Sequence, residues 1–113
     1  METNKEPAKR DNADKLDWTQ LDFKALEAAI RVQSWGNKKY GRDNWRNGMT
    51  NNTILQSMTR HVVALNKGEM IDGDTKESHA AHILLNAMYW LHYNKNYDQT
   101  ANIKEALTEN TYE

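Results

Sequence analysis

The sequence predicts a small all-α protein: a bundle of three main helices plus a short C-terminal helix, with a basic, aromatic loop between the first two helices. Three observations lead to this prediction. Apolar residues recur at helical spacing in three segments, residues that cap or end helices bound those segments, and no useful stretch alternates apolar and polar residues as a strand would. The length of 113 residues fits one domain.

Composition narrows the class of protein further. Hydrophobic residues make up 38% of the chain and charged residues 27%, so we expect a modest core to which four Trp, five Tyr and five Met contribute bulky groups. No apolar run reaches the roughly 18 residues that a membrane span needs. The amino terminus shows no secretory signal. The absence of cysteine excludes disulfides, thiolate metal sites and cysteine nucleophiles. A formal net charge of -1 gives no general signature of binding to long nucleic acids.

Three segments follow from the distribution of charged and apolar residues. Residues 1–15 carry alternating charges and the only proline, and we interpret them as a flexible N-terminal tail. Residues 16–95 hold the periodic apolar pattern and form the helical domain. Residues 96–113 are polar, with a possible short helix whose packing residues would be Ile103 and Leu107.

The first helix is expected over about residues 22–34. One face is marked by Phe23, Leu26 and Ile30, and it is widened by Ala25, Ala29 and Val32. Gly36 and Asn37 are expected to end the helix. Residues 36–52 would then form the loop, in which three glycines permit unusual backbone conformations and aromatic side chains anchor the basic ones.

Two further helices are expected, over about residues 50–67 and 78–94. The apolar face of the first is formed by Ile54, Met58, Val62 and Leu65. Ser78 is a suitable N-cap for the second, whose apolar stripe is formed by Ala80, Leu84, Ala87 and Leu91. These stripes predict how each helix faces the core.

The second face of the helix at 78–94 carries imidazole, amide and phenol groups. These fall on one stripe at 100° per residue: His79, His82, Asn86, Tyr89 and Tyr93. A merely solvated face would more often carry Lys and Glu. We therefore weigh two interpretations of this stripe, a ligand or metal site and a polar contact between helices or between copies of the chain.

Metal ligation is one role for this region. His79 and His82 are three residues apart, so both side chains can reach one point, and an acidic loop with Glu69 and Asp72 precedes them. Two imidazoles with carboxylates would suit a transition metal, whereas carboxylates alone would suit Mg²⁺ or Mn²⁺. His61 lies at the edge of an apolar face, where it is either a satisfied core histidine or a member of the site.

A basic and aromatic stretch between the first two helices predicts an anion site. Its basic residues are Lys39, Arg42 and Arg46, and Arg60 could join them, because guanidinium groups match phosphate oxygens. Tyr40 and Trp45 lie among them and could stack on a purine. The alternative is that these charges simply face water.

A family resemblance is carried by residues of these same regions. The segment Lys39 to Gly48 reads KYGxxNWRxG and is followed in order by Arg60-His61, Gly68-Glu69, Asp72 and an SHxxH motif that begins at Ser78. Over roughly residues 16–93 the sequence resembles the N-terminal domain family of phage dATP/dGTP diphosphohydrolases. The resemblance implies a helical phage protein that acts in nucleotide metabolism in the host cytoplasm.

Three functional hypotheses result. The first is a phosphohydrolase, or pyrophosphohydrolase-like enzyme, that cleaves a purine (deoxy)nucleoside triphosphate with a metal-activated water, the metal being Mg²⁺ or Mn²⁺. The second is a binding module that sequesters a nucleotide without cleaving it, for example a host immune signalling nucleotide, as an anti-defence sponge. The third is a structural or protein-interaction module. In each case we expect a homo-oligomer, because a core this small often gains stability from a partner chain.

The first hypothesis assigns specific roles. The expected ligand-binding residues are Lys39, Tyr40, Arg42, Asn44, Trp45, Arg46, Arg60, His79, His82 and Asn86. The expected catalytic residues are Glu69, Asp72 and His61, and the expected metal ligands are Glu69, Asp72, His79 and His82. No membrane and no long nucleic acid is expected as a partner.

Overall fold

The computed structural model describes residues 6–95, and this part of the chain is helical. In order it contains the 3-10 helix η1 (Trp18–Gln20), α1 (Phe23–Tyr40), the 3-10 helix η2 (Asn44–Asn47), α2 (Asn51–Asn66) and α3 (His79–Tyr93). No strand occurs in this range, apart from one isolated bridge between Ile71 and Ser78. The expected all-α class is therefore confirmed. The possible short helix after residue 96 lies outside the described residues.

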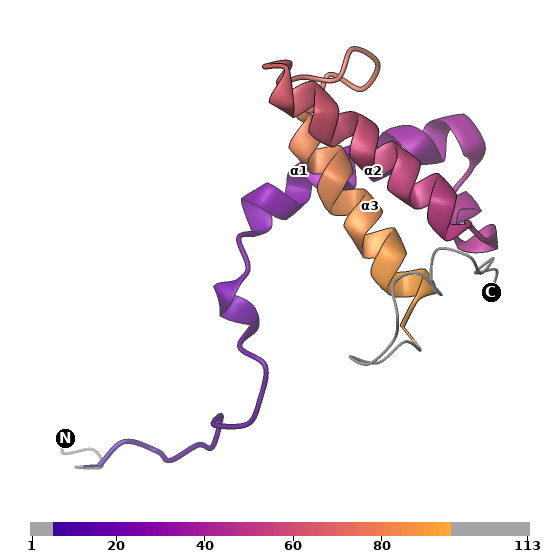
Figure 1. Ribbon diagram of the computed structural model, residues 1–113. Helices are drawn as coiled ribbons and strands as arrows, with labels where there is room; N and C mark the ends of the chain where they lie inside the picture. Colours follow the sequence, from indigo (N-terminus) through magenta and orange to yellow (C-terminus); the bar gives the residue numbers. More distant parts are fainter. Residues whose placement is uncertain (1–5, 96–113) are drawn as a thin grey trace.

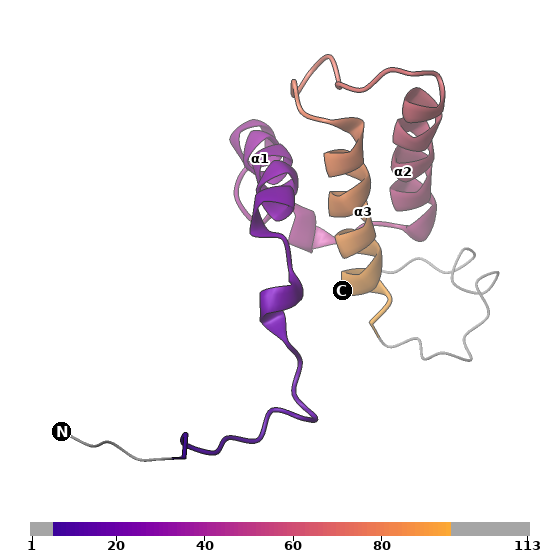
Figure 2. The ribbon, with the colours of Figure 1, turned by 90° about the vertical axis from the view of Figure 1, so that its left-hand side faces the viewer.

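The helices form a single layer with α3 in the middle. Figure 2 shows α3 between α1 and α2, and α3 packs against both of them. The loop that follows α2 crosses above the start of α3 (Figure 1). None of the helices described by the structure is long and apolar enough to cross a bilayer.

Each main helix begins at a side-chain cap. Asp22 accepts hydrogen bonds from the backbone N–H groups of Lys24 and Ala25, Thr50 accepts one from Thr53, and Ser78 accepts one from Ala80 at 3.0 Å. These caps satisfy N–H groups that have no partner within the helix. The predicted start of the third helix at Ser78 is confirmed.

The first helix is longer than predicted. It continues through Gly36 and Asn37 to Tyr40, so the expected end near residue 34 is wrong. A single glycine costs a helix only about 1 kcal/mol relative to alanine, and Gln33 bridges this region by donating from Nε2 to Asn37 Oδ1 at 2.9 Å. The helix ends instead at Gly41, whose φ of 96° a residue with a Cβ rarely adopts.

The orientation of α3 is the main correction to the sequence-based prediction. The stripe expected to face the core is turned outward: Ala80 is exposed, Leu84 is 40% exposed and Leu91 is 70% exposed. The stripe of imidazole, amide and phenol groups faces inward instead, with Tyr89 and Tyr93 in the core. The two tyrosines bury large ring surfaces, and their hydroxyl groups form hydrogen bonds inside the bundle. This face can therefore be buried without leaving those hydroxyl groups unsatisfied.

The core is small and is assembled from all three helices. Its buried members are Ala29, Val32, Ile54, Ala81, Leu85, Tyr89 and Tyr93. Two residues expected on the core face of α1, Phe23 and Ile30, are about 60% exposed, and Val62 of α2 is 50% exposed. The structure thus leaves much of the predicted apolar surface uncovered.

A buried pair of amides joins the start of α2 to the end of α3. Asn51 is fully buried, and its Nδ2 donates to Asn94 Oδ1 at 3.0 Å while Asn94 Nδ2 donates back to Asn51 Oδ1 at 2.7 Å. Such reciprocal bonding satisfies polar groups that would be costly to bury alone. This pair holds the C-terminal end of α3 against the N-terminal end of α2.

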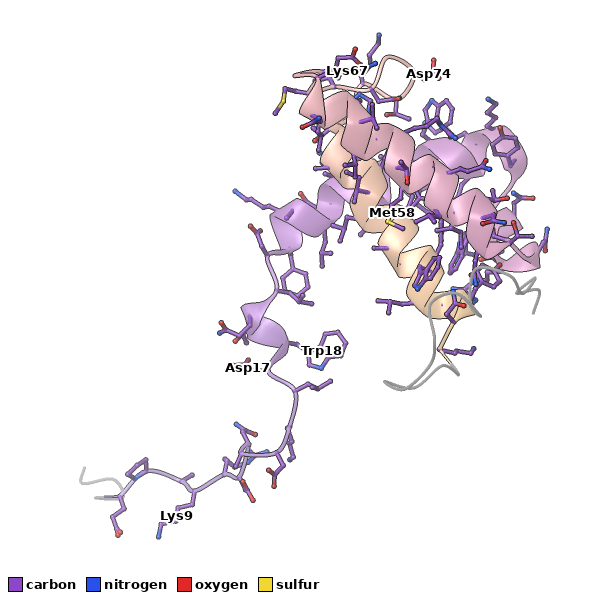
Figure 3. All side chains as sticks on the ribbon, in the orientation of Figure 1. Lys9, Asp17, Trp18, Met58, Lys67 and Asp74 are labelled. Carbon is purple, nitrogen blue, oxygen red and sulfur yellow. The ribbon has the colours of Figure 1, made fainter. Side chains whose placement is uncertain are left out.

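The N-terminal residues of the described range extend away from the helical layer (Figures 1 and 3). Residues 6–15 are exposed and contain no helix or strand. Trp18 in η1 is 66% exposed, and Asp17 caps that short helix through its side chain. This arm therefore contributes nothing to the core.

Candidate functional site

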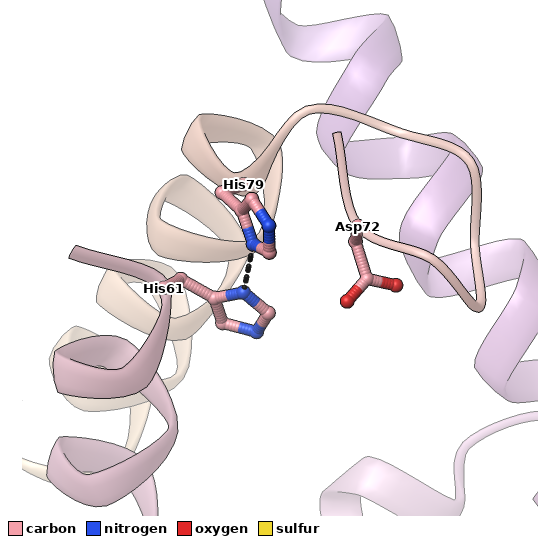
Figure 4. Close-up of side chains that lie close together, drawn as sticks. All are labelled: His61, Asp72 and His79. Carbon is pink, nitrogen blue, oxygen red and sulfur yellow. Dashed lines mark hydrogen bonds between the residues drawn. The ribbon is translucent and has the colours of Figure 1, made fainter. Parts of the chain in front are cut away.

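Three histidines and one aspartate meet at the upper end of α3, and we call this group the imidazole cluster. His61 comes from α2, His79 and His82 come from the first turn of α3, and Asp72 comes from the loop at residues 67–78 (Figure 4 shows His61, Asp72 and His79). Sequence analysis expected His79, His82 and Asp72 to meet. His61, expected as a catalytic residue, is half-buried and points to the same place.

The members of the imidazole cluster are in direct contact. The Nδ1 atoms of His61 and His79 lie 2.8 Å apart in a hydrogen bond. The rings of His61 and His82 stack with their centroids 4.2 Å apart. His82 Nε2 lies 2.8 Å from the Thr75 hydroxyl and 3.6 Å from Asp72 Oδ2. The three histidines thus form one connected group of side chains.

The loop that carries Asp72 is held by its own sequence. Asp72 Oδ2 accepts hydrogen bonds from the backbone N–H groups of Asp74 and Thr75, at 3.1 and 2.9 Å, and from the Thr75 hydroxyl at 3.1 Å. This is a turn that aspartate followed by threonine favours. At the other side of the loop, Arg31 of α1 donates to Glu77 at 2.8 Å. The loop is therefore tied both to itself and to α1.

Burial and neighbouring groups set the protonation of the imidazole cluster. Burial, together with the imidazoles of His82 and His79, lowers the pKa of His61 from 6.5 to about 4. Burial also lowers the pKa of His82, although the Asp72 carboxylate opposes this. Burial alone would raise the pKa of Asp72, but the hydrogen bonds from Thr75 and Asp74 and the nearby His82 hold it below its usual value. At neutral pH, an ionised carboxylate therefore lies beside neutral imidazoles at positions 61 and 82.

A pocket of about 300 Å³ lies next to the imidazole cluster. It is bounded mainly by α1, the segment around η2 and α3, and His82 forms part of its wall. Its aromatic lining residues are Trp35, Tyr40, Trp45 and Tyr89, and its amide and hydroxyl lining residues are Gln33, Asn37, Asn44, Ser57 and Asn86. Because His82 borders the pocket and also bonds to Thr75, the pocket and the imidazole cluster share a side chain.

A chain of hydrogen bonds orients the amides of the pocket. The Tyr89 hydroxyl donates to Gln33 Oε1, and Gln33 Nε2 donates to Asn37 Oδ1 at 2.9 Å. Burial raises the pKa of Tyr89 to about 12, so its hydroxyl stays protonated and remains a donor. On the opposite side, Asn86 Nδ2 donates to Ser57 Oγ at 3.2 Å and to the His82 carbonyl at 2.8 Å. Within the described part of the chain, no side-chain hydrogen bond uses Asn37 Nδ2 or Asn86 Oδ1, so both atoms can meet a ligand.

Trp45 is held by the protein's own side chains. Its ring stacks on Tyr89 with centroids 5.4 Å apart, and the guanidinium of Arg46 lies 4.2 Å over the ring. The edge of His92 also contacts it, and the Tyr93 hydroxyl donates to the Trp45 carbonyl. Tyr40, in contrast, is 60% exposed, with Lys39 Nζ 5.2 Å from its ring centroid. Of the two aromatic residues expected to stack on a base, Tyr40 is the more accessible.

The basic residues are not gathered into one cluster. Lys39 contacts the rings of Trp35 and Tyr40, Arg46 is paired with Asp43 at 3.3 Å, and Arg42 is exposed. Arg60 points elsewhere, into a shallow hollow on α2 that also contains Asn52 and Leu55. The structure therefore does not bring Arg60 to the pocket. Glu69 is exposed and lies outside the group of His61, Asp72 and His79, although we expected it to be a metal ligand.

Several residues of the site were missed by the sequence analysis. Gln33 and Asn37 lie four residues apart on α1 and line the same pocket as Tyr40, which the sequence analysis did expect. This spacing is visible in the sequence, but we placed the end of the helix before Asn37 and so assigned it to a loop. Thr75 was also missed, although an Asp-x-x-Thr segment is a recognisable turn signal.

Comparisons with known proteins agree with the resemblance found in the sequence. The family model described as dATP/dGTP diphosphohydrolase, N-terminal, matches residues 5–103. A protein of Salmonella phage PMBT28 named dATP/dGTP diphosphohydrolase is 36% identical over 77 residues, which is 66% of this chain and 26% of that protein. The chain thus spans about a quarter of the length of this relative. No solved structure matches.

Proposed function

The chain belongs to the dATP/dGTP diphosphohydrolase N-terminal family, and from this premise we propose that it binds a purine deoxynucleoside triphosphate in the pocket between α1, η2 and α3. The single observation that carries the proposal is the position of His82. This side chain forms part of the pocket wall and also contacts Thr75 and the Asp72 carboxylate. A ligand in the pocket would therefore lie beside groups that can handle protons or charge.

The chemistry of the pocket suits a purine base. Small-molecule sites are mostly apolar and aromatic, with a few placed polar groups. Here Trp35 and Tyr40 offer aromatic surface, while Asn37 Nδ2 is an unused donor and Asn86 Oδ1 an unused acceptor. Every base presents a donor and an acceptor on its Watson–Crick edge and can meet such a pair, so the larger stacking surface of a purine on these aromatic rings is what would favour adenine and guanine.

The phosphates would extend toward His82. Its pKa is lowered, so the imidazole is neutral at pH 7 and can donate or accept one hydrogen bond. Lys39 lies over the rings of Trp35 and Tyr40, and Arg46 lies over the ring of Trp45, so both cations stand beside aromatic rings that line the pocket. Hydrolysis would add water across the bond between the α- and β-phosphates, giving a nucleoside monophosphate and pyrophosphate. Asp72, 3.6 Å from His82 Nε2, and His61, stacked on His82, would be the candidates to accept a proton from that water.

Calorimetric titration of the full chain tests this proposal. We expect dATP and dGTP to bind at least tenfold more tightly than dCTP and dTTP. Asn37→Ala should weaken purine binding about tenfold, since it removes the donor, whereas Asn52→Ala on the outer surface of α2 serves as the matched control and should leave affinity unchanged. Equal binding of all four nucleotides, or no binding, would show that the pocket does not recognise purines.

Binding without cleavage is the second candidate function, and it is favoured by the lining of the pocket, which among the described residues includes no carboxylate. Such a module would sequester a nucleotide, with a host signalling nucleotide as one possible ligand. The nucleotide should be recovered chemically intact after the complex is heat-denatured. Recovery of monophosphate and pyrophosphate would instead support the hydrolase.

A further inference from the structure

Three potential metal-ligating side chains converge in the imidazole cluster from three separate segments. They are His61 in α2, Asp72 in the loop and His79 at the start of α3, and one ligand atom from each lies within 4.8 Å of the other two (Figure 4). The three segments are consecutive in the chain, and the packing of α2 against α3 brings their side chains together. The set also differs from the ligands expected from the sequence, because Glu69 and His82 are absent from it and His61 is present.

The spacing of the two imidazoles suits a shared ion. Their Nδ1 atoms are 2.8 Å apart. Two nitrogen ligands at about 2.1 Å from a metal would be about 3.0 Å apart for a right angle and about 3.4 Å apart for a tetrahedral angle. A shift of only a few tenths of an ångström would therefore exchange the hydrogen bond between the rings for two bonds to one ion.

The carboxylate is oriented before any ion arrives. Asp72 Oδ2 takes all the hydrogen bonds from Asp74 and Thr75, which leaves Oδ1 without a hydrogen-bond partner within the described part of the chain. The loop is closed at its base, because Asp72 N–H donates to the Glu77 carbonyl at 2.9 Å and His79 N–H donates to the Met70 carbonyl at 3.0 Å. Partners of this kind fix metal ligands in place and raise affinity.

From this geometry we propose that His61, Asp72 and His79 bind one divalent transition-metal ion. Two imidazole nitrogens and one carboxylate oxygen suit manganese, iron, cobalt or zinc, whereas Mg²⁺ takes oxygen ligands and retains water. Three protein ligands leave coordination positions open, and His82 lies between this site and the pocket. The proposal concerns the metal site alone and holds whether or not the pocket takes a nucleotide.

The test uses the full chain, stripped with a chelator and free of nucleotide. Titration calorimetry with MnCl₂, CoCl₂ and ZnCl₂ should each show one ion bound per chain, with MgCl₂ binding at least tenfold more weakly. Co²⁺ should also give visible absorption bands that report ligation by nitrogen. Absence of binding by all three transition ions at millimolar concentration would overturn the proposal.

Variants locate the site. His61→Asn and Asp72→Asn should each weaken Mn²⁺ binding about 10- to 100-fold, and Asp72→Asn is the milder change, because asparagine can keep the turn with Thr75. Their matched controls are His92→Asn, a half-buried histidine beside Trp45, and Asp74→Asn in the same loop. Circular dichroism checks that each variant is folded. If folded His61→Asn and Asp72→Asn bind Mn²⁺ as tightly as their controls do, the ion is held elsewhere and the assignment is wrong.

Discussion

Acid should destabilise the metal-free protein through His61. In the folded chain its pKa is lowered from 6.5 to about 4, whereas the unfolded chain takes up this proton near pH 6.5. Between these values the unfolded state binds more protons, so the free energy of unfolding falls as the pH drops from about 6.5 to 4. The full shift would correspond to about 3 kcal/mol. Because the ring is only half-buried and solvent screens it, we expect about 1–2 kcal/mol.

The comparison that isolates this effect is His61→Asn, which keeps a polar side chain but cannot titrate. Urea unfolding with a chelator present, at pH 7.0 and at pH 4.5, should show the wild-type protein losing about 1–2 kcal/mol more than the variant does. His92→Asn should behave as the wild-type protein. An identical pH dependence in the wild-type protein and His61→Asn would refute the argument, because it would mean that His61 has the same pKa in both states.

Other predictions concern the helices and their outer surface. Gly36→Ala should stabilise α1 by about 0.5–1 kcal/mol in thermal unfolding, since the added methyl meets nothing within 4 Å, whereas Gly41→Ala should destabilise it because φ is positive there. Asn51→Ala and Asn94→Ala should each cost about 2–3 kcal/mol in urea unfolding, and the double variant should cost less than their sum. If the expected homo-oligomer forms through the outward face of α3, Leu91→Lys should lower the mass seen by sedimentation. An unchanged mass would exclude this face.

The helical class and the start of each main helix could be predicted from local signals. Asp22, Thr50 and Ser78 act on backbone groups two or three residues away, so their effect is encoded within a few positions. The end of α1 could not be predicted in the same way. Gly36 weakens the helix locally, but the hydrogen bonds of Gln33 with Tyr89 of α3 and with Asn37 help to offset this cost.

The candidate site was only partly predictable for a similar reason. Recognition that His79, His82 and Asp72 share a region needed only helical spacing and a short loop. The participation of His61 depends on how α2 packs against α3, and the separation of Arg60 from the pocket depends on the rotation of α2. Neither the packing of α2 against α3 nor the rotation of α2 can be derived from the local spacing of apolar residues.

The sequence by itself determined that the chain is helical, about where each main helix begins, which family it resembles and which side chains could carry chemistry. Only the tertiary structure decided which face of α3 is buried. Either face of α3 could be packed against the neighbouring helices. Which face is buried depends on which neighbouring groups can form hydrogen bonds with the polar atoms of that face. Tyr89 finds Gln33, Tyr93 finds the Trp45 carbonyl, and the histidines find one another. A polar stripe therefore became the interior of the bundle, and an apolar one was left on its surface.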